Sequence, residues 1–208
     1  MRVNESGRSM IEMLGVLAII GVLSVGGIAG YSKAMNKFKT NQVADNVSML
    51  VANIKTLYAQ QKTYTGLNNT SAVSMGVVPD ELGTSATLTN AFNGNVFIAS
   101  GNSTTGETGN RAFVIAFAGL SKEACITLAT NDWGSGYSSG LIYIKATGAK
   151  NETYDITSAA GLIGCSGSTA AGSAVACPGH NMPMPVQAAA NACNCNAGNQ
   201  CAIQWKYY

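Results

Sequence analysis

The sequence is poor in charge. Charged residues make up only 11% of the 208-residue chain, and the formal net charge is +2. This balance gives no basic face of the kind that nucleic-acid binding needs, so we expect no direct nucleic-acid partner. Hydrophobic residues still reach 47%, which is enough to build a core and argues against a disordered chain. The length leaves room for one globular domain and an appendage.

Cysteine is missing from the first half of the chain. The second half contains six cysteines: Cys125, Cys165, Cys177, Cys193, Cys195 and Cys201. An even number of cysteines in a polar region behind an N-terminal apolar segment is typical of disulfides in an oxidising compartment. The alternative, reduced thiols buried in a cytosolic protein, is disfavoured by that apolar segment. Six cysteines allow fifteen complete pairings, so their spacing leaves the connectivity open.

Sequence motifs of catalysis are also missing. The chain has no Walker loop, dinucleotide fingerprint, paired-carboxylate motif or Gly-x-Ser-x-Gly elbow. Its one histidine, His180, is in Cys-x-x-His spacing with Cys177, which zinc permits. An exported compartment favours disulfides instead, and Cys-x-Cys is not the usual zinc pair. We therefore predict a protein that is not an enzyme and has no cofactor or metal.

The longest apolar run lies near the N-terminus, from Met10 to Tyr31, and Glu12 is its one charged residue. As a helix these 22 residues span about 33 Å, which covers the roughly 30 Å hydrocarbon core of a bilayer. A secretory signal peptide has a shorter apolar centre and a small-residue cleavage site after it. Here the run continues into a helical pattern, so we predict a retained transmembrane helix.

The run itself leaves two questions open. Glu12 is either an interfacial residue whose carboxylate reaches the head groups, or an intramembrane acid that needs a positive partner, because burial near the bilayer centre costs about 2.5–3.5 kcal/mol. For orientation, two arginines precede the run and three lysines follow it closely, which slightly favours a cytoplasmic C-terminal side. The cysteines indicate that this side is exported, and we give them more weight.

The residues around Glu12 resemble the N-terminus of type IV pilin precursors. The stretch GRSMIEML (7–14), followed by VLAIIG (16–21), has the family's glycine, glutamate and apolar run. In that family, prepilin peptidase cuts after the glycine, the new N-terminal residue is methylated, and a glutamate four residues later faces the N-terminal amine of a neighbouring subunit. The resemblance implies cleavage after Gly7, methylation of Arg8 and an assembly role for Glu12. The segment lacks the proline of the type IVa subclass, which favours type IVb.

Apolar residues continue at three- and four-residue steps beyond the membrane segment. They are Phe38, Val47, Leu50, Val51, Ile54, Leu57 and Tyr58. One helix from about Ser9 to Gln61 is therefore predicted, apolar all round in its first half and amphipathic in its second. We divide the chain into a leader (1–7), this long helix (8–61, with the membrane segment at 10–31) and a globular head (62–208).

The head is predicted to be α+β, with the long helix packed on a mainly antiparallel sheet and a disulfide-stabilised, cysteine-rich C-terminal region from residue 125 to 208. Asn93-Gly94 is a turn signal, and Ser121 is a candidate N-cap for a short helix with Glu123 in its first turn. The segment GLIGCSGSTAAGSAVACPG (161–179) is interpreted as a surface loop. The expected strands are 96–99, 111–120, 140–146 and 202–208.

The head also resembles type IVb pilins, especially those of conjugative thin pili. The similar motifs are VP, LTNAFNGNV, FVIAF and SKEAC, in this order. In that family the helix cysteine pairs with one near the C-terminus, which implies that Cys125 pairs with Cys193, Cys195 or Cys201. Within that scheme we expect the pairs Cys125–Cys193, Cys165–Cys177 and Cys195–Cys201.

The resemblance implies a structural subunit of a type IV pilus, held in the bacterial inner membrane as a precursor and polymerised into an extracellular filament. Its partners would be prepilin peptidase, an assembly ATPase with its platform protein, and copies of itself. The filament's role, whether adhesion, aggregation, conjugation or DNA uptake, stays open.

Two alternatives remain. One is a minor pilin or type II secretion pseudopilin; pseudopilins often bind calcium through a C-terminal acidic loop, whereas Asp and Glu are absent after Asp155. The other is a membrane-anchored exported binding domain that does not polymerise, in which replacement of Glu12 has no effect.

Overall fold

The computed structural model describes the chain in several stretches. The described residues are 6–103, 109–134, 137–148, 173–178, 181–195 and 201–208. Contacts divide the chain into two units, Met1–Phe38 and Lys39–Tyr208.

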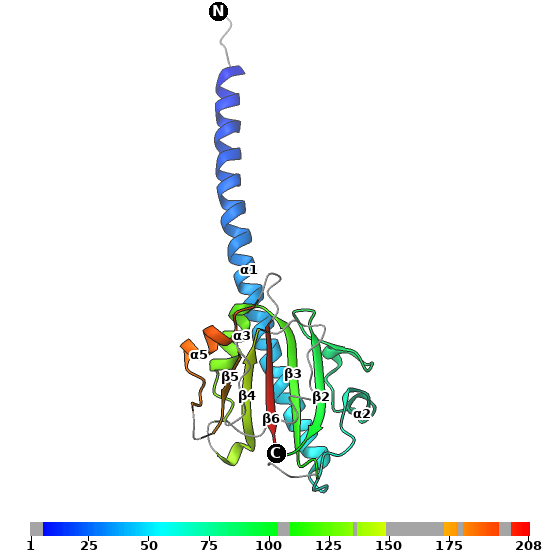
Figure 1. The fold of residues 1–208 in the computed structure, drawn as a ribbon. Helices are drawn as coiled ribbons and strands as arrows, with labels where there is room; N and C mark the ends of the chain where they lie inside the picture. The colour runs from blue at the N-terminus through cyan, green and yellow to red at the C-terminus, as the bar shows by residue number, and fades with distance from the viewer. Residues whose placement is uncertain (1–5, 104–108, 135–136, 149–172, 179–180, 196–200) are drawn as a thin grey trace, which may run out of the picture. The chain divides into compact units, whose positions relative to one another are not determined.

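The first unit contains the N-terminal part of helix α1, which runs from Ser6 to Tyr58 (Figure 1). The large apolar side chains between Met10 and Tyr31 are 53–75% exposed. By length and composition this helix is apolar enough to cross a membrane, with a mean hydropathy of 2.2 in its most apolar window. A surface of this kind is stable in lipid or against other apolar helices, which agrees with the membrane segment predicted at 10–31.

The second unit contains the C-terminal part of α1, which is amphipathic. Its buried face consists of Val43, Val47, Leu50, Ile54 and Tyr58. Most of the predicted apolar positions in this unit lie on this face, but Leu57 is 44% exposed.

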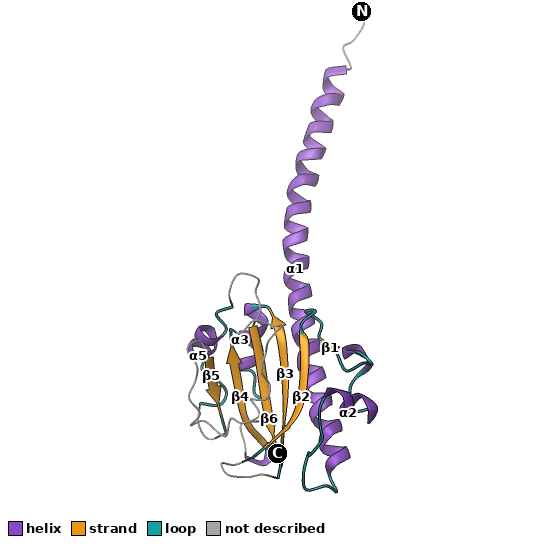
Figure 2. Ribbon diagram, turned by 45° about the vertical axis from the view of Figure 1, so that its right-hand side comes forward, coloured by secondary structure: helices purple, strands orange, loops and turns teal. Residues whose placement is uncertain are grey.

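The head is built on a six-stranded sheet in which every described pairing is antiparallel. The spatial order is β1-β2-β3-β6-β4-β5, so the C-terminal strand lies at the centre (Figure 2). The strands are β1 (Leu88–Thr89), β2 (Asn95–Gly101), β3 (Ala112–Leu120), β4 (Leu141–Thr147), β5 (Ser173–Ala176) and β6 (Cys201–Tyr207). The head part of α1 lies against one face of this sheet (Figure 1). The α+β class is confirmed.

Shorter helices complete the head. They are α2 (Asn69–Ser74), α3 (Lys122–Thr130) and α5 (Val186–Ala192), with 3-10 turns at Asp80–Leu82 and Tyr137–Ser139. Helix α3 begins where predicted, because the Ser121 hydroxyl accepts a hydrogen bond from the Ala124 amide at 3.2 Å. Strand β5 corrects the interpretation of 161–179 as a loop at Ser173–Ala176, which pair with β4, whereas residues 161–172 and 179 lie outside the described part of the chain. Small residues give little strand signal, so this pairing depends on the neighbouring strand.

The β1–β2 turn is fixed by close backbone packing. Asn93 has φ 62°, and the Asn90 side-chain amide donates to the Ala118 carbonyl oxygen at 2.8 Å. A Cβ on Gly94 would collide with the backbone of Ala118, and one on Gly119 (φ +71°) would collide with Gly94. The turn predicted at Asn93-Gly94 thus packs against a bulge in β3. The two backbones can come this close only because both Gly94 and Gly119 lack a Cβ atom.

The central strand β6 is buried on both faces. Ile203, Trp205 and Tyr207 belong to the main core, while Gln204 and Lys206 on the opposite face are 0% exposed. Gln204 donates a side-chain hydrogen bond to the Tyr143 hydroxyl. Alternation in the sequence predicted a strand here, but the burial of its polar side chains follows from its central position.

Candidate functional site

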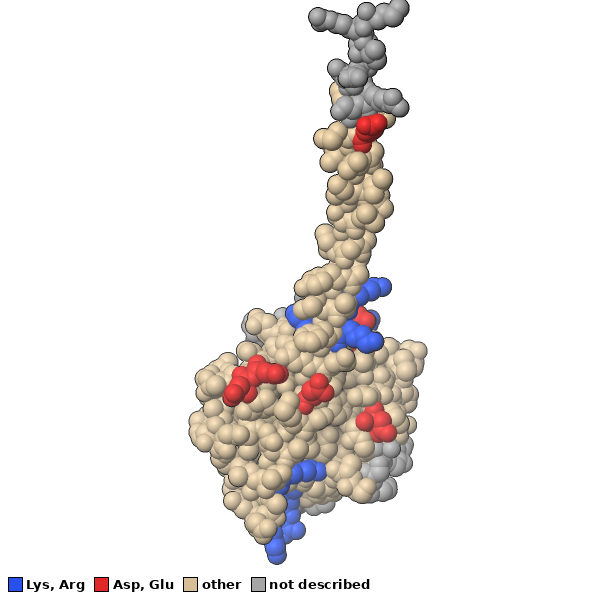
Figure 3. All heavy atoms as spheres, turned by 180° about the vertical axis from the view of Figure 1, so that it is seen from behind, with Lys and Arg blue, Asp and Glu red and all other residues tan. Residues whose placement is uncertain are grey.

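The predicted processing and assembly residues lie at the start of α1. The backbone at Gly7 and Arg8 is helical, and Glu12 follows on the same helix with an exposed side chain. In Figure 3 the apolar part of the helix carries one acidic group, at its N-terminal end. The first unit therefore combines a long exposed apolar surface with one carboxylate near its N-terminal end.

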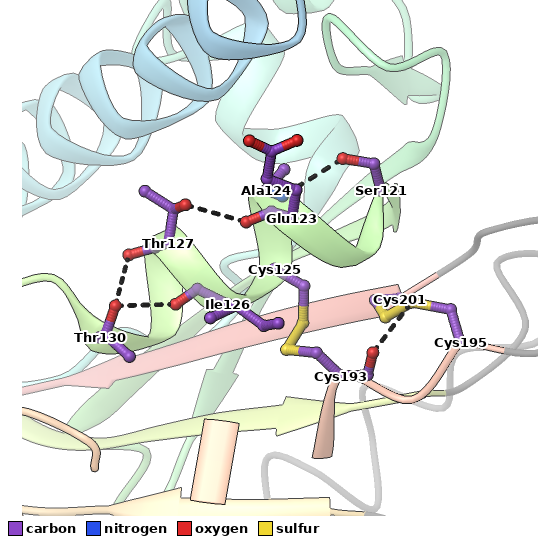
Figure 4. Close-up of a disulfide and its surroundings, with 10 residues drawn as sticks. All are labelled: Ser121, Glu123, Ala124, Cys125, Ile126, Thr127, Thr130, Cys193, Cys195 and Cys201. Carbon is purple, nitrogen blue, oxygen red and sulfur yellow. Dashed lines mark hydrogen bonds between the residues drawn. A yellow bond between two sulfur atoms is a disulfide. The ribbon is translucent and has the colours of Figure 1, made fainter. Parts of the chain in front are cut away.

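Four of the predicted cysteines meet beside α3. Cys125 of α3 is bonded to Cys193, the residue after α5, with Cα atoms 5.9 Å apart. Cys195 is bonded to Cys201, the first residue of β6, with Cα atoms 5.2 Å apart (Figure 4). Both bonds are among the three pairs expected from the sequence, and the first is one of those that the resemblance implies for Cys125. The pairing links α3, the end of α5 and the start of the central strand.

The remaining predicted site residues lie partly outside the described part of the chain. Cys177 is disulfide-bonded, but its expected partner Cys165 falls outside the described residues, as does His180. The Sγ atoms of Cys125, Cys193 and Cys201 lie within 4.8 Å of one another. Sequence spacing carried no signal for this proximity, because residues far apart in the chain are brought together only by the sheet order.

Lys55, near the C-terminal end of α1, contacts both the 3-10 turn Tyr137–Ser139 and the C-terminal strand β6. Lys55 donates to the Ser139 carbonyl oxygen at 2.9 Å, and its Nζ lies 4.9 Å from the centre of the Tyr207 ring. The Tyr207 ring in turn stacks on Phe113 at a centroid distance of 5.8 Å. Burial lowers the pKa of Lys55 and raises the pKa of Tyr207.

The raised pKa of Tyr207 predicts alkaline destabilisation. The unfolded chain releases this proton near pH 10, before the folded head does. The stability that Tyr207 contributes is thus fully present below about pH 10 and falls above it, by up to about 1.4 kcal/mol per pH unit. In urea unfolding between pH 8 and 11.5, we expect Tyr207→Phe to lose stability less steeply than the unchanged chain. Burial lowers the pKa of Lys55, so the titration of Lys55 changes stability with pH in the opposite direction. This contribution is present in both Tyr207→Phe and the unchanged chain.

The matched control is Tyr208→Phe, because Tyr208 is 51% exposed. This variant should follow the unchanged chain at every pH. Parallel curves for Tyr207→Phe and the unchanged chain would contradict the assignment to Tyr207.

Comparison with known proteins identifies the family. A family model described as PilS N terminal matches residues 37–205. Two curated relatives, the major structural subunits of the bundle-forming pilus from Escherichia coli O127:H6 (strain E2348/69 / EPEC) and Escherichia coli O111:H-, are each 29% identical over 133 residues, covering 63% of this chain and 67% of theirs.

A solved structure shares the fold. The crystal structure of TcpA, a type IV pilin from Vibrio cholerae El Tor biotype, matches with a TM-score of 0.53 at 19% identity, covering 82% of this chain and 99% of that one. The family model spans most of this chain, from the second half of α1 into β6. The chain therefore belongs to the PilS N-terminal family and is a type IV pilin, a structural protein rather than an enzyme.

Proposed function

We propose that this pilin is the polymerising structural subunit of a type IV pilus and that the first unit of α1 is its assembly element. The observation that carries the proposal is the exposed apolar surface from Met10 to Tyr31, which needs lipid before assembly and neighbouring helices after it. The relatives named as major structural subunits of a pilus support the same role. The filament is extracellular, and the precursor is held in the inner membrane.

Maturation is proposed to remove residues 1–7. Prepilin peptidase cuts between Gly7 and Arg8, and the new N-terminal amine of Arg8 is methylated. Glu12 then lies four residues from the new N-terminus, about 6 Å along the helix. An assembly ATPase with its platform protein moves the mature subunit from the membrane into the filament.

Glu12 is proposed to pair with the N-terminal amine of a neighbouring subunit. Within an apolar bundle of helices, an unpaired carboxylate and an unpaired ammonium are each costly. Their mutual contact offsets much of that cost and fixes how far one helix is shifted along the next. Register within the filament would thus be set by a single charge pair.

Replacement of Glu12 by Gln tests this proposal. Leaving a buried amine unpaired costs about 3–5 kcal/mol, so we expect the yield of sheared surface filaments to fall by about 100-fold or more. Cleavage after Gly7 and the amount of pilin in the membrane should stay unchanged. The assay compares filament-bound and cell-bound pilin in a strain that supplies the peptidase and the assembly machinery.

The matched control is Asp45→Asn, which removes an exposed carboxylate from the same helix within the head unit. Its filament yield should equal that of the unchanged chain. Normal filaments from Glu12→Gln would contradict the proposed pairing and favour an anchored domain that does not assemble through this residue.

A further inference from the structure

The two disulfides beside α3 form one sulfur cluster with a buried and an accessible side. The Sγ atoms of Cys125, Cys193 and Cys201 lie within 4.8 Å of one another, and these three residues are 0% exposed. Cys195 is only half-buried, and its Sγ lies 3.4 Å from the Cys193 carbonyl oxygen. Among these four residues (Figure 4), Cys195 is therefore the one that is not fully buried.

We propose that Cys195 is the site at which an external disulfide oxidant reacts with the head, and that the outer Cys195–Cys201 pair relays oxidation to the inner Cys125–Cys193 pair. The oxidant belongs to the class of exported thiol–disulfide proteins or glutathione disulfide. The relay depends on an oxidising compartment and does not depend on polymerisation through α1.

Loop length favours formation of the outer disulfide first. Its cysteines are 6 residues apart in sequence, whereas those of the inner pair are 68 residues apart. Because the probability of loop closure falls as roughly the three-halves power of length, the outer pair meets about 40-fold more often in a flexible chain. The outer disulfide is therefore available while the inner cysteines are still thiols.

Oxidation of the outer pair consumes one external disulfide. The Cys195 thiolate attacks this disulfide, forming a mixed disulfide and releasing one thiolate of the oxidant. The Cys201 thiolate then attacks the Sγ of Cys195, which forms the Cys195–Cys201 bond and releases the second thiolate of the oxidant. The oxidant is reduced by two electrons, and the two cysteines are oxidised by two.

Transfer to the inner pair consists of two further exchanges between neighbouring sulfur atoms. The Cys125 thiolate attacks the Sγ of Cys201 and releases the Cys195 thiolate. The Cys193 thiolate then attacks the Sγ of Cys125, which forms the inner disulfide and releases the Cys201 thiolate. A second equivalent of oxidant re-forms the outer disulfide, which gives the doubly oxidised cluster of the structure.

Burial is the reason that the inner pair needs this route. A direct reaction requires a mixed disulfide between a buried cysteine and a bulky oxidant, and the folded head leaves Cys125 and Cys193 no exposed surface. The relay requires only that sulfur atoms already within 4.8 Å of one another approach to bonding distance. The partial exposure of Cys195 and the short distances between the other three sulfur atoms are together the reason that we assign the reaction with the oxidant to Cys195.

The test follows disulfide formation in the full chain in detergent micelles. Reduced protein is refolded, glutathione disulfide is added, and samples are alkylated over time and mapped by peptide mass. In Cys195→Ser/Cys201→Ser we expect the Cys125–Cys193 bond to form about 10-fold or more slowly, whereas in concentrated urea its rate should equal that of the unchanged chain. The control, Cys165→Ser/Cys177→Ser, removes the other two cysteines of the chain and should keep the native rate.

Two single variants decide the question even if the double variant does not fold. In Cys195→Ser the remaining Cys201 thiol lies beside the inner disulfide, so mapping should reveal Cys125–Cys201 or Cys193–Cys201 bonds. In the matched Cys201→Ser variant the inner bond should stay intact. The relay requires this difference between the two single variants. It is overturned if the Cys125–Cys193 bond forms at the same rate in Cys195→Ser/Cys201→Ser as in the unchanged chain. It is also overturned if the Cys195→Ser protein contains only the Cys125–Cys193 bond and a free Cys201.

Discussion

Replacing both Cys125 and Cys193 by serine is expected to lower the free energy of unfolding of the head by about 4 kcal/mol. The two residues are 68 positions apart, and their bond removes a large loop-closure entropy from the unfolded chain. It also joins α3 to the end of α5, next to the first residue of the central strand. A loss of this size is a large part of the stability of an ordinary domain, so we expect poor folding at 37 °C.

The outer disulfide provides the matched comparison. Its cysteines are 6 positions apart, so the same chain-entropy relation gives about 2 kcal/mol for Cys195→Ser/Cys201→Ser. Urea unfolding of both double variants, followed by tryptophan fluorescence, measures the difference. Equal losses, or a larger loss for the outer pair, would show that loop closure is not the source of the stabilisation.

Replacing Trp205 by alanine is expected to destabilise the head by about 3–5 kcal/mol. Trp205 is 0% exposed on the central strand. Its ring makes edge contacts with Phe117 at 6.0 Å and with Trp133 at 5.0 Å between centroids. Removal of the ring would leave a cavity at the centre of the sheet's main core face, where little can move in to fill it.

Trp205→Phe separates the packing of the ring from its polar atom. The Trp205 Nε1 has no hydrogen-bond partner within the described residues, so phenylalanine loses ring volume but no hydrogen bond. Its loss of stability, taken from urea midpoints, should be less than half that of Trp205→Ala. If the two variants lose stability equally, the site depends on the indole nitrogen, and the packing explanation fails.

Much of the head could be predicted from local sequence patterns. The alternation of Ile203, Trp205 and Tyr207 placed β6 within one residue of its bounds, and Ser121 placed the start of α3. These signals are strong because side-chain periodicity and capping act over a few neighbouring residues. The long apolar run likewise placed the exposed part of α1.

The features that sequence analysis missed depend on tertiary contacts. Helix α2 and strand β5 are only 6 and 4 residues long, too short for a periodic signal. The burial of Gln204 and Lys206 follows from the position of β6 between β3 and β4. The proximity of the two disulfides also comes from this sheet order, since Cys201 begins the strand that the order places at the centre.

The assembly residues were predicted in another way. Gly7, Arg8 and Glu12 were identified through the resemblance of their short motif to pilin precursors, because the apolar run alone left the role of Glu12 open. The family assignment supports the pilin role, and processing and pairing at these three residues remain proposals. Their test requires filaments rather than the isolated chain.

The mass of pilin from sheared surface filaments tests the central claim most directly. The chain is expressed with prepilin peptidase and the assembly machinery, and the filaments are collected and dissolved without reduction. We predict a mature chain that begins at Arg8, carries the mass of N-methylation, and is six hydrogens lighter than the reduced form because all six cysteines are oxidised. A chain that begins at Met1 and stays in the membrane would contradict the account.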